Sequence, residues 1–299
     1  MLHISSLPVK AANEGNRDAQ PGALTRERPI GQLLCQAKNL LPSQVDQILA
    51  HQRQHGGRFG EVAIALGLAT EEDILEALAK QFEYPYVRFG DSGIDAELVC
   101  ACDPFGEDAQ SFRELRDELL TGVLDKAAPR ALAVLSPQIG DGRSYVAANL
   151  AVTCAQLGGR TLLVDANMRT PRLHALFGID DSVGLSKLLC GGVREVVQQA
   201  PVPSLFLLGA GPPPPNPLEL LQRSTFSKLC REWLARFDFV VVDTPAASYG
   251  PDARVIAAAA GAALAVARPQ VTRIAELQRL LSSIEKGPAA LAGVVMNEH

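Results

Sequence analysis

Residues 130–145 read RALAVLSPQIGDGRSY, and this stretch decides the fold. Its apolar run Ala131–Leu135 predicts a strand of a parallel sheet, because such strands are buried on both faces. A turn containing Gly140 and Gly142 follows, and residues 146–152 then open a helix. Glycines let backbone N–H groups turn inward, and the N-terminus of a helix adds a partial positive charge. The stretch therefore predicts a phosphate-binding loop, although an ordinary glycine-rich turn has the same pattern.

The loop departs from the usual P-loop pattern, in which a glycine stands five residues before the final Gly-Lys-Ser/Thr. Pro137 occupies the place of that glycine, and Arg143 occupies the place of the lysine. The charge of Arg143 can still neutralise phosphate, and the hydroxyl of Ser144 can still meet Mg²⁺. The chemistry of a phosphate site is therefore retained although the motif is not.

Two further apolar runs each end in a carboxylate. Residues 161–169 read TLLVDANMR and carry Asp165, and residues 237–245 read FDFVVVDTP and carry Asp243. Parallel strands deliver their carboxyl ends to one edge of a sheet, so both acids are expected beside the phosphate loop. Two such carboxylates near a phosphate loop predict a site for a Mg²⁺-bound nucleotide.

Composition restricts the class of protein. The chain has 299 residues, of which 47% are hydrophobic, and can therefore form two domains with a large core. A net charge of −5 without any block rich in Lys and Arg argues against nucleic acid as a partner. The six cysteines show no CxxC spacing, and neither a signal peptide nor a membrane-spanning window is visible. A cytoplasmic protein with reduced thiols is expected.

Four segments are predicted along the chain. Residues 1–28 are polar and patternless and are expected to be disordered. Residues 29–87 are expected to form a helical domain, and residues 88–103, where the pattern lapses, a linker. Residues 104–299 are expected to form the P-loop domain.

The helical domain contains two copies of one unit. Pairing Gly31 with Gly60 also pairs four further positions, namely Leu33 with Val62, Val45 with Ile74, Leu49 with Leu78 and Gln52 with Gln81. A capping pattern at Thr70 predicts a helix that runs through Lys80, and Pro42 is expected to begin the matching helix. Because each unit is too small to bury a core alone, the pair should pack as one domain.

The helical domain resembles the N-terminal domain of type II secretion and pilus ATPases, including residues 83–87, EYPYV. Some relatives of that domain bind cyclic di-GMP through an Arg-hydrophobic-Gly motif, which residues 58–60, RFG, match and residues 29–31, PIG, do not. The alternative is a helical docking module without a ligand. His51 and His55 lie four residues apart, but no third metal ligand is evident nearby, so surface histidines are expected.

Strands and helices alternate through the second domain, which predicts an α/β fold: a P-loop NTPase-like, mostly parallel sheet with helices on both faces, preceded by the small all-helical domain. Asn216 is expected to cap a helix that has Pro217 in its first position. The predicted helices are 110–120, 146–157, 185–189, 218–237, 253–259 and 274–284, and the predicted strands after the first are 161–164, 205–208, 240–242, 262–267 and 291–296.

The region from about residue 104 to the end resembles the bacterial tyrosine kinases of capsule and exopolysaccharide export, which belong to the MinD-like and ParA-like ATPases. The resemblance rests on five motifs: 112–116 FRELR, 140–144 GDGRS, 163–171 LVDANMRTP, 215–221 PNPLELL and 241–245 VVDTP. Together with the domain in front, the chain resembles the chain-length-determinant tyrosine kinases of exopolysaccharide gene clusters.

The resemblance implies a set of roles in a site for ATP or ADP with Mg²⁺. The nucleotide would be held by the loop and by two residues facing the adenine, namely Gly140, Asp141, Gly142, Arg143, Ser144, Tyr145, Arg268 and Asn297. The metal would be held by Ser144, Asp165 and Asp243. The catalytic set would be Arg143 in place of the lysine, Asp165 as the base, Asn167, and Arg169 close to the reacting phosphate. A helix carrying Arg113 and Arg116 would dock on a neighbouring subunit and form a homo-oligomer.

The chain departs from the family pattern at several positions. Arg143 replaces the loop lysine, Asn167 stands where a second aspartate is expected, and Gln110 replaces the first glutamate of the docking helix. The tyrosines are Tyr84, Tyr86, Tyr145 and Tyr249, and they form no tyrosine-rich tail. These differences bear on catalysis and on assembly.

The resemblance implies a tyrosine autokinase that controls exopolysaccharide chain length. Its partner would be the cytoplasmic tail of a membrane polysaccharide co-polymerase, which would recruit it to the inner membrane. A nucleotide-sensing scaffold without kinase activity is the alternative of a different class. A MinD-like or ParA-like ATPase is a third interpretation, although the early lysine of that group and a terminal basic amphipathic helix are both missing.

Overall fold

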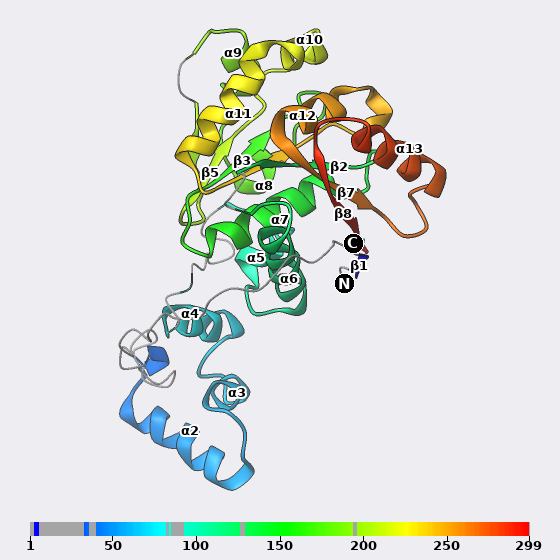
Figure 1. Cartoon of the computed structure of the whole chain (residues 1–299). Helices are drawn as coiled ribbons and strands as arrows, with labels where there is room; N and C mark the ends of the chain where they lie inside the picture. Colours follow the sequence, from blue (N-terminus) through cyan, green and yellow to red (C-terminus); the bar gives the residue numbers. More distant parts are fainter. Residues whose placement is uncertain are drawn as a thin grey trace, which may run out of the picture. The chain divides into compact units, whose positions relative to one another are not determined.

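The computed structural model describes residues 3–5, 33–35, 40–81, 84, 93–125, 129–193 and 196–298 (Figure 1). The chain divides into two compact units, one from Pro8 to Arg88 and the other from Phe89 to the end together with residues 1–7. No helix in these described ranges has the length and apolar character needed to cross a membrane.

The larger unit is built on one sheet of eight strands in the order β1-β8-β7-β2-β6-β3-β5-β4. Six of them run parallel: β2 (Ala131–Leu135), β3 (Thr161–Asp165), β5 (Leu205–Leu208), β6 (Phe239–Asp243), β7 (Gly261–Ala267) and β8 (Ala290–Met296). The short edge strands β1 (His3–Ser5) and β4 (Gln198–Gln199) are antiparallel. Since β2 and β3 are buried at every residue, their apolar sequences match their place in the centre of the sheet.

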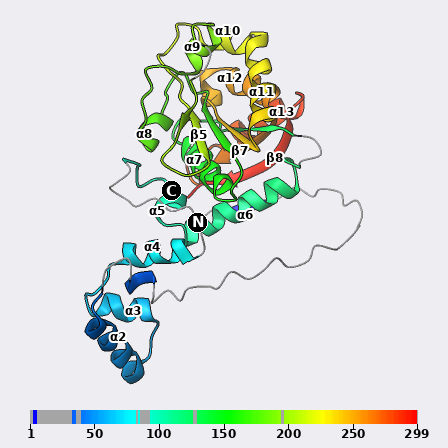
Figure 2. The same ribbon diagram turned by 90° about the vertical axis from the view of Figure 1, so that its left-hand side faces the viewer.

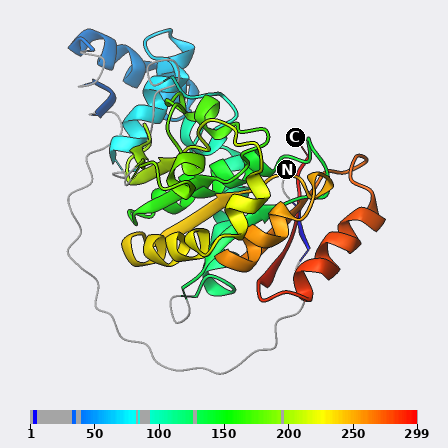
Figure 3. The same cartoon turned by 90° about the horizontal axis from the view of Figure 1, so that it is seen from above.

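Helices cover both faces of this sheet. On one face lies α7 (Arg143–Ala155), with α5 (Val99–Cys102) and α6 (Glu107–Thr121) packed on it. The other face carries the helices α10 (Pro217–Gln222), α11 (Ser224–Arg236), α12 (Asp252–Ala260) and α13 (Ile274–Glu285). Figures 1 and 2 show α6 and α10–α13 on opposite sides of the sheet, and Figure 3 shows the yellow to red-orange helices side by side. The short helices α8 (Leu173–Phe177), α9 (Leu185–Leu189) and η1 (Ala247–Tyr249) lie in the connections. The predicted α/β class is confirmed.

The segment 218–237, predicted as one helix, forms two helices in the structure. The segment 218–237 contains α10 and α11, which are separated at Arg223, where the backbone is extended with φ −67° and ψ 147°. The break lets α10 contact α9 and α12 while α11 packs on β6 and α12. Asn216 precedes α10 and Pro217 begins it, but the Asn216 side chain makes no capping hydrogen bond. The predicted cap is therefore wrong, and the predicted place of Pro217 is confirmed.

The predicted linker is wrong where the structure describes it, at residues 93–103. This segment belongs to the sheet unit and includes α5. Asn149 of α7 holds it, because its Oδ1 accepts the Cys100 N–H at 3.0 Å and its Nδ2 donates to the Glu97 carbonyl at 2.8 Å. Ile94, Leu98 and Ala101 of this segment are also buried, so both apolar packing and these hydrogen bonds hold it.

The expected disorder of residues 1–28 is contradicted at His3–Ser5, which pair with Val294–Met296 of β8. The rest of that segment lies outside the described residues.

The smaller unit contains α2 (Pro42–His55), α3 (Phe59–Ala65) and α4 (Glu71–Gln81), together with a helical turn at residues 33–35. The starts of α2 and α4 are positions that the repeat alignment pairs, as the repeat predicts. Thr70 caps α4, since its Oγ1 accepts the Asp73 N–H at 3.3 Å and Asp73 Oδ2 accepts the Thr70 N–H at 2.8 Å. Residues from both copies share one core, namely Leu34, Ile48, Val62, Ala63, Ala69 and Ala77.

Candidate nucleotide-binding site

A pocket of about 700 Å³ opens where β2 runs into α7. This size is ample for a small organic ligand. Eight of the residues expected at a nucleotide site line it: Gly140, Gly142, Arg143, Ser144, Tyr145, Asn167, Arg268 and Asn297. These eight residues thus share one cavity, at the carboxyl edge of a parallel sheet, where ligands of such folds bind. The other predicted site residues, Asp141, Asp165, Arg169 and Asp243, do not line it.

The loop is held in its shape by contacts behind it. Gly142 has φ +94°, and a Cβ atom there would lie 1.9 Å from Asn297 Nδ2, so only glycine fits. Asp141 is fully buried: its Oδ2 accepts the Gln138 N–H at 2.7 Å and its Oδ1 accepts the Thr272 hydroxyl at 2.8 Å. Asn297 Nδ2 donates to the Asp141 carbonyl at 3.2 Å. Asp141 therefore shapes the loop and does not line the pocket.

Arg143 does not point its charge at the pocket as the lysine of a P-loop does. Its guanidinium is buried and donates to the Thr244 carbonyl at 3.0 Å, to the Gln138 carbonyl at 2.6 Å and to the Ser136 hydroxyl. Burial lowers the pKa of Arg143, against the opposing charges of Asp243 and Asp141. The expectation that Arg143 meets the phosphates directly is not supported by this geometry, because its side chain ties the loop to the segment after β6.

Ser144, Asp165 and Asp243 come together as predicted for a magnesium site. Asp165 and Asp243 are register neighbours at the ends of β3 and β6, and Ser144 Oγ donates to Asp243 Oδ2 at 2.5 Å. Burial raises the pKa of Asp243 to about 6 even though Arg143 and the Ser144 bond oppose the change. Among the described residues Asp243 Oδ1 is buried without a hydrogen-bond partner. A buried carboxylate oxygen without a hydrogen-bond partner, close to a serine hydroxyl, is a suitable ligand for Mg²⁺.

Asp165 accepts hydrogen bonds from the backbone of the loop that follows β3. Its Oδ1 accepts the Asn167 N–H and its Oδ2 accepts the N–H groups of Arg172 and Leu173, all at 3.1 Å. Burial raises the pKa of Asp165 well above the usual value, and the charge of Asp243 adds to the effect. Oδ1, which accepts a single N–H, has capacity for a second bond.

Asn167 and Arg169 both form hydrogen bonds with other side chains or carbonyls of the protein. Asn167 is buried and forms a closed turn with Thr170, whose carbonyl accepts from Asn167 Nδ2 at 2.7 Å. Arg169 Nε donates to the buried Asp252 at 3.1 Å, and its guanidinium lies over the Tyr249 ring at 5.7 Å. Arg169 does not line the pocket, so its expected place close to the reacting phosphate is not what this structure shows.

Three residues expected around the nucleotide lie at the pocket wall. Arg268 Nη1 donates to the Gly140 carbonyl at 3.4 Å, and Asn297 is almost fully buried against the loop. The ring of Tyr145 packs edge-on against Phe112 of α6, with 5.6 Å between centroids. Their contact with adenine or phosphate stays a prediction.

Glu97 and Arg172 also line the pocket, and sequence reasoning missed both. They form an ion pair in which both side chains are about half exposed. Arg172 follows the Asp165 motif by a few residues, which is the signal that could have found it. Glu97 gives no such signal, because it lies in the segment without periodicity.

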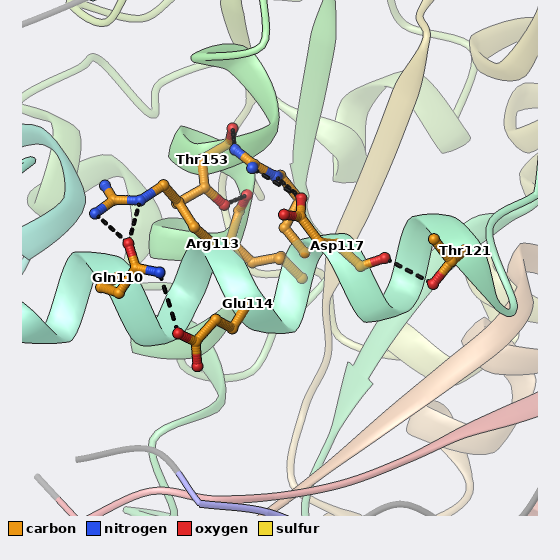
Figure 4. A network of polar contacts seen from close by, with 8 residues as sticks. Gln110, Arg113, Glu114, Asp117, Thr121 and Thr153 are labelled. Carbon is orange, nitrogen blue, oxygen red and sulfur yellow. Dashed lines mark hydrogen bonds and ion pairs between the residues drawn. The ribbon is translucent and has the colours of Figure 1, made fainter.

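The helix α6 uses its two arginines within the chain, and Figure 4 shows Arg113 beside Gln110. Arg116 is buried, and its Nη1 donates to the Thr153 carbonyl of α7 at 3.0 Å. Arg113 donates from Nε to Gln110 Oε1 at 3.0 Å and from Nη1 to the Pro104 carbonyl at 2.5 Å. Arg116 therefore anchors α6 to the helix of the phosphate loop. Docking of α6 on a neighbouring subunit stays a prediction.

In the smaller unit the packing of α3 against Ile74 of α4 explains why position 60 is a glycine. A Cβ atom at Gly60 would lie 3.1 Å from Ile74 Cδ1, so the glycine permits the close approach of α3 to α4. His51 and His55 stack with 4.4 Å between ring centroids. Within the described part of the chain no group of three or more His, Cys, Asp or Glu side chains could hold a metal.

Comparison with known proteins bears on the site. The chain is 31% identical over 192 residues to CapB of Staphylococcus aureus, a tyrosine-protein kinase by name, and the match covers 64% of this chain and 84% of CapB. The chain belongs to the bacterial tyrosine-protein kinases. It is 30% identical to EpsB of Ralstonia solanacearum, a tyrosine-protein kinase by name, over 302 residues, which cover 97% of this chain. No family model matches the chain.

A solved structure of this kinase family has the same fold. The kinase domain of Escherichia coli tyrosine kinase ETK superposes with a TM-score of 0.65 at 26% identity and covers 70% of this chain and 82% of that domain. The chain spans 39% of the length of EpsB.

Proposed function

We propose that this chain is a Mg²⁺-ATP-dependent tyrosine autokinase that regulates exopolysaccharide polymerisation, export and chain length. The observation that carries the proposal is the hydrogen bond from Ser144 to Asp243, together with the Asp243 Oδ1 atom, which has no hydrogen-bond partner among the described residues. Both residues lie beside the phosphate loop, in a chain from a tyrosine-kinase family. Ser144 and Asp243 would hold Mg²⁺, which would supply charge neutralisation on the phosphates of ATP.

The protein's own contribution would be positioning and proton transfer. In the transfer a tyrosine oxygen bonds to the γ-phosphorus as the bond from that phosphorus to the β-phosphate oxygen breaks, and ADP leaves. Asp165 would take the hydroxyl proton, since burial and the charge of Asp243 raise its pKa and so make its carboxylate a stronger base. Backbone N–H groups of residues 140–144 would orient the phosphates at the N-terminus of α7.

Substitution of Asp243 by asparagine tests the site. Asp243→Asn removes the charge that would hold the metal, and Mg²⁺-dependent binding of ATP should be lost, as measured by calorimetry. Asp238→Asn is the matched control, because Asp238 is an exposed acid just before the opposite end of β6. Unchanged binding in Asp243→Asn would refute the site assignment.

Intact-mass analysis of the protein with Mg²⁺-ATP tests the reaction. A phosphate adduct mapped to tyrosine would support the autokinase. Release of ADP without an adduct, in the presence and absence of the cytoplasmic tail of a co-polymerase, would support a MinD-like or ParA-like ATPase instead.

A second candidate is a nucleotide-binding scaffold of the same polysaccharide machinery. It is favoured by Arg143, whose charge is used inside the loop, and by Asn167, which is closed on Thr170. ATP that binds and stays intact, with and without the cytoplasmic tail of a co-polymerase, would support the scaffold. In that case the nucleotide would shift the balance between two assembly states.

The partners are proposals of their own. We propose the cytoplasmic tail of a membrane polysaccharide co-polymerase as the partner that recruits the chain to the inner membrane, and a homo-oligomer formed through the outer face of α6. Cyclic di-GMP at residues 58–60 is a further candidate ligand. Titration of the chain with that dinucleotide, with Arg58→Ala as the comparison, would test it.

A further inference from the structure

The guanidinium of Arg143 is used in bonds within the protein, and the pocket contains two further arginines. The Arg143 guanidinium donates to three acceptors on the far side of the loop, and its burial makes those bonds costly to give up. The arginines that line the pocket besides Arg143 are Arg172 and Arg268. Arg268 is half-buried, and its Nη1 donates to the Gly140 carbonyl of the loop at 3.4 Å.

Arg172 is placed next to the two acids. Its backbone N–H donates to Asp165 Oδ2 at 3.1 Å, which fixes its position beside the ends of β3 and β6. The charge of Arg172 also reaches Asp243, whose pKa it helps to lower against the effect of burial. The side chain lines the pocket and is about half exposed, so it is free to turn toward a ligand.

Glu97 faces Arg172 across the same pocket. Its backbone is held by Asn149, which donates to its carbonyl at 2.8 Å, and by Asp95, which accepts its N–H at 2.9 Å. The carboxylate itself is about half exposed and pairs with Arg172. Exposed pairs of this kind are weak, so the multiply charged phosphates of a nucleotide can displace Glu97.

We propose that Arg172 is the phosphate-binding cation of this pocket and that Glu97 is its counter-ion when no nucleotide is bound. The inference rests on the proposed nucleotide site and adds to it the residue that replaces the lysine of the usual motif. Binding of a nucleoside triphosphate or diphosphate exchanges the Glu97 pair for a pair with a terminal phosphate. The planar guanidinium suits such a contact, because it can donate two parallel hydrogen bonds.

Calorimetry with Mg²⁺-ATP and with adenosine tests the assignment. Arg172→Ala should weaken ATP binding about tenfold to a hundredfold, the range for a lost hydrogen bond to a charged group, and leave adenosine binding unchanged. Glu97→Gln should tighten ATP binding, because the competing carboxylate is gone. Arg231→Ala is the control, since Arg231 is exposed on α11 and does not line the pocket. A thermal melt should show that each variant is folded.

Two results separate this inference from the proposed function. ATP binding that is unchanged in Arg172→Ala, or weakened in Glu97→Gln, would overturn the assignment while the nucleotide site stands. A wild-type protein that binds no nucleotide would overturn both.

Discussion

Replacement of Gly142 by alanine should destabilise the sheet unit far more than the same change at Gly140. Both glycines have left-handed backbones, with φ +94° and +85°, so each alanine costs about 1–2 kcal/mol of backbone strain. At Gly140 nothing lies within 4 Å of the new Cβ atom, whereas at Gly142 the atom would lie 1.9 Å from Asn297 Nδ2.

The second cost at Gly142 comes from Asn297. Its amide must move and give up the bond to the Asp141 carbonyl, and a displaced amide in a buried position costs about 1–3 kcal/mol. We therefore expect a loss of about 2–5 kcal/mol for Gly142→Ala and about 1–2 kcal/mol for Gly140→Ala.

Denaturant unfolding followed by tryptophan fluorescence measures both losses. Trp233 is the single tryptophan of the chain and is buried in α11, so its emission reports the sheet unit. The double variant Gly142→Ala/Asn297→Ala should recover part of the loss, because the clash is removed. Equal losses for the two glycine variants would refute the reasoning, since both positions have left-handed backbones and only at Gly142 does the new Cβ atom meet another atom within 4 Å.

Two further predictions concern the buried acids and α6. In the folded protein the pKa of Asp243 is raised to about 6, so the folded state binds this proton more tightly than the unfolded state does. The free energy of unfolding should therefore fall as the pH rises from about 4 to about 6. Chemical denaturation across that range should show a smaller fall in Asp243→Asn, and an equal fall would contradict the assignment. Arg116→Ala should cost about 1–3 kcal/mol, because it removes a buried donor from the Thr153 carbonyl. In the same unfolding assay the half-buried Arg113→Ala should cost less, and the reverse order would show that α6 is held elsewhere.

The strands and the loop could be predicted from the sequence because their signals are local. The runs that form β2, β3 and β6 are continuous and apolar, and the glycines of the loop mark where the backbone must turn. The two acids were placed together by topology alone, since parallel strands end at one edge.

The directions of the side chains could not be predicted in the same way. Arg143 was expected to face the pocket, but three acceptors distant in sequence or across the turn hold it inward. The linker expectation failed for a related reason, because Asn149, some 50 residues away, holds residues 97–100. Such contacts depend on which elements pack together, and no pattern within a short window of sequence records them.

The helix α7 joins the nucleotide site to α6. Its N-terminus carries Ser144, its middle holds residues 97–100 through Asn149, and its last turn accepts the buried Arg116 through Thr153. A subunit contact made by α6 would then have to use its outer face, where Gln110 and Glu114 are exposed (Figure 4). One helix therefore contacts both the phosphate loop and α6, so the homo-oligomer proposed above would have its contact surface one helix away from the nucleotide site.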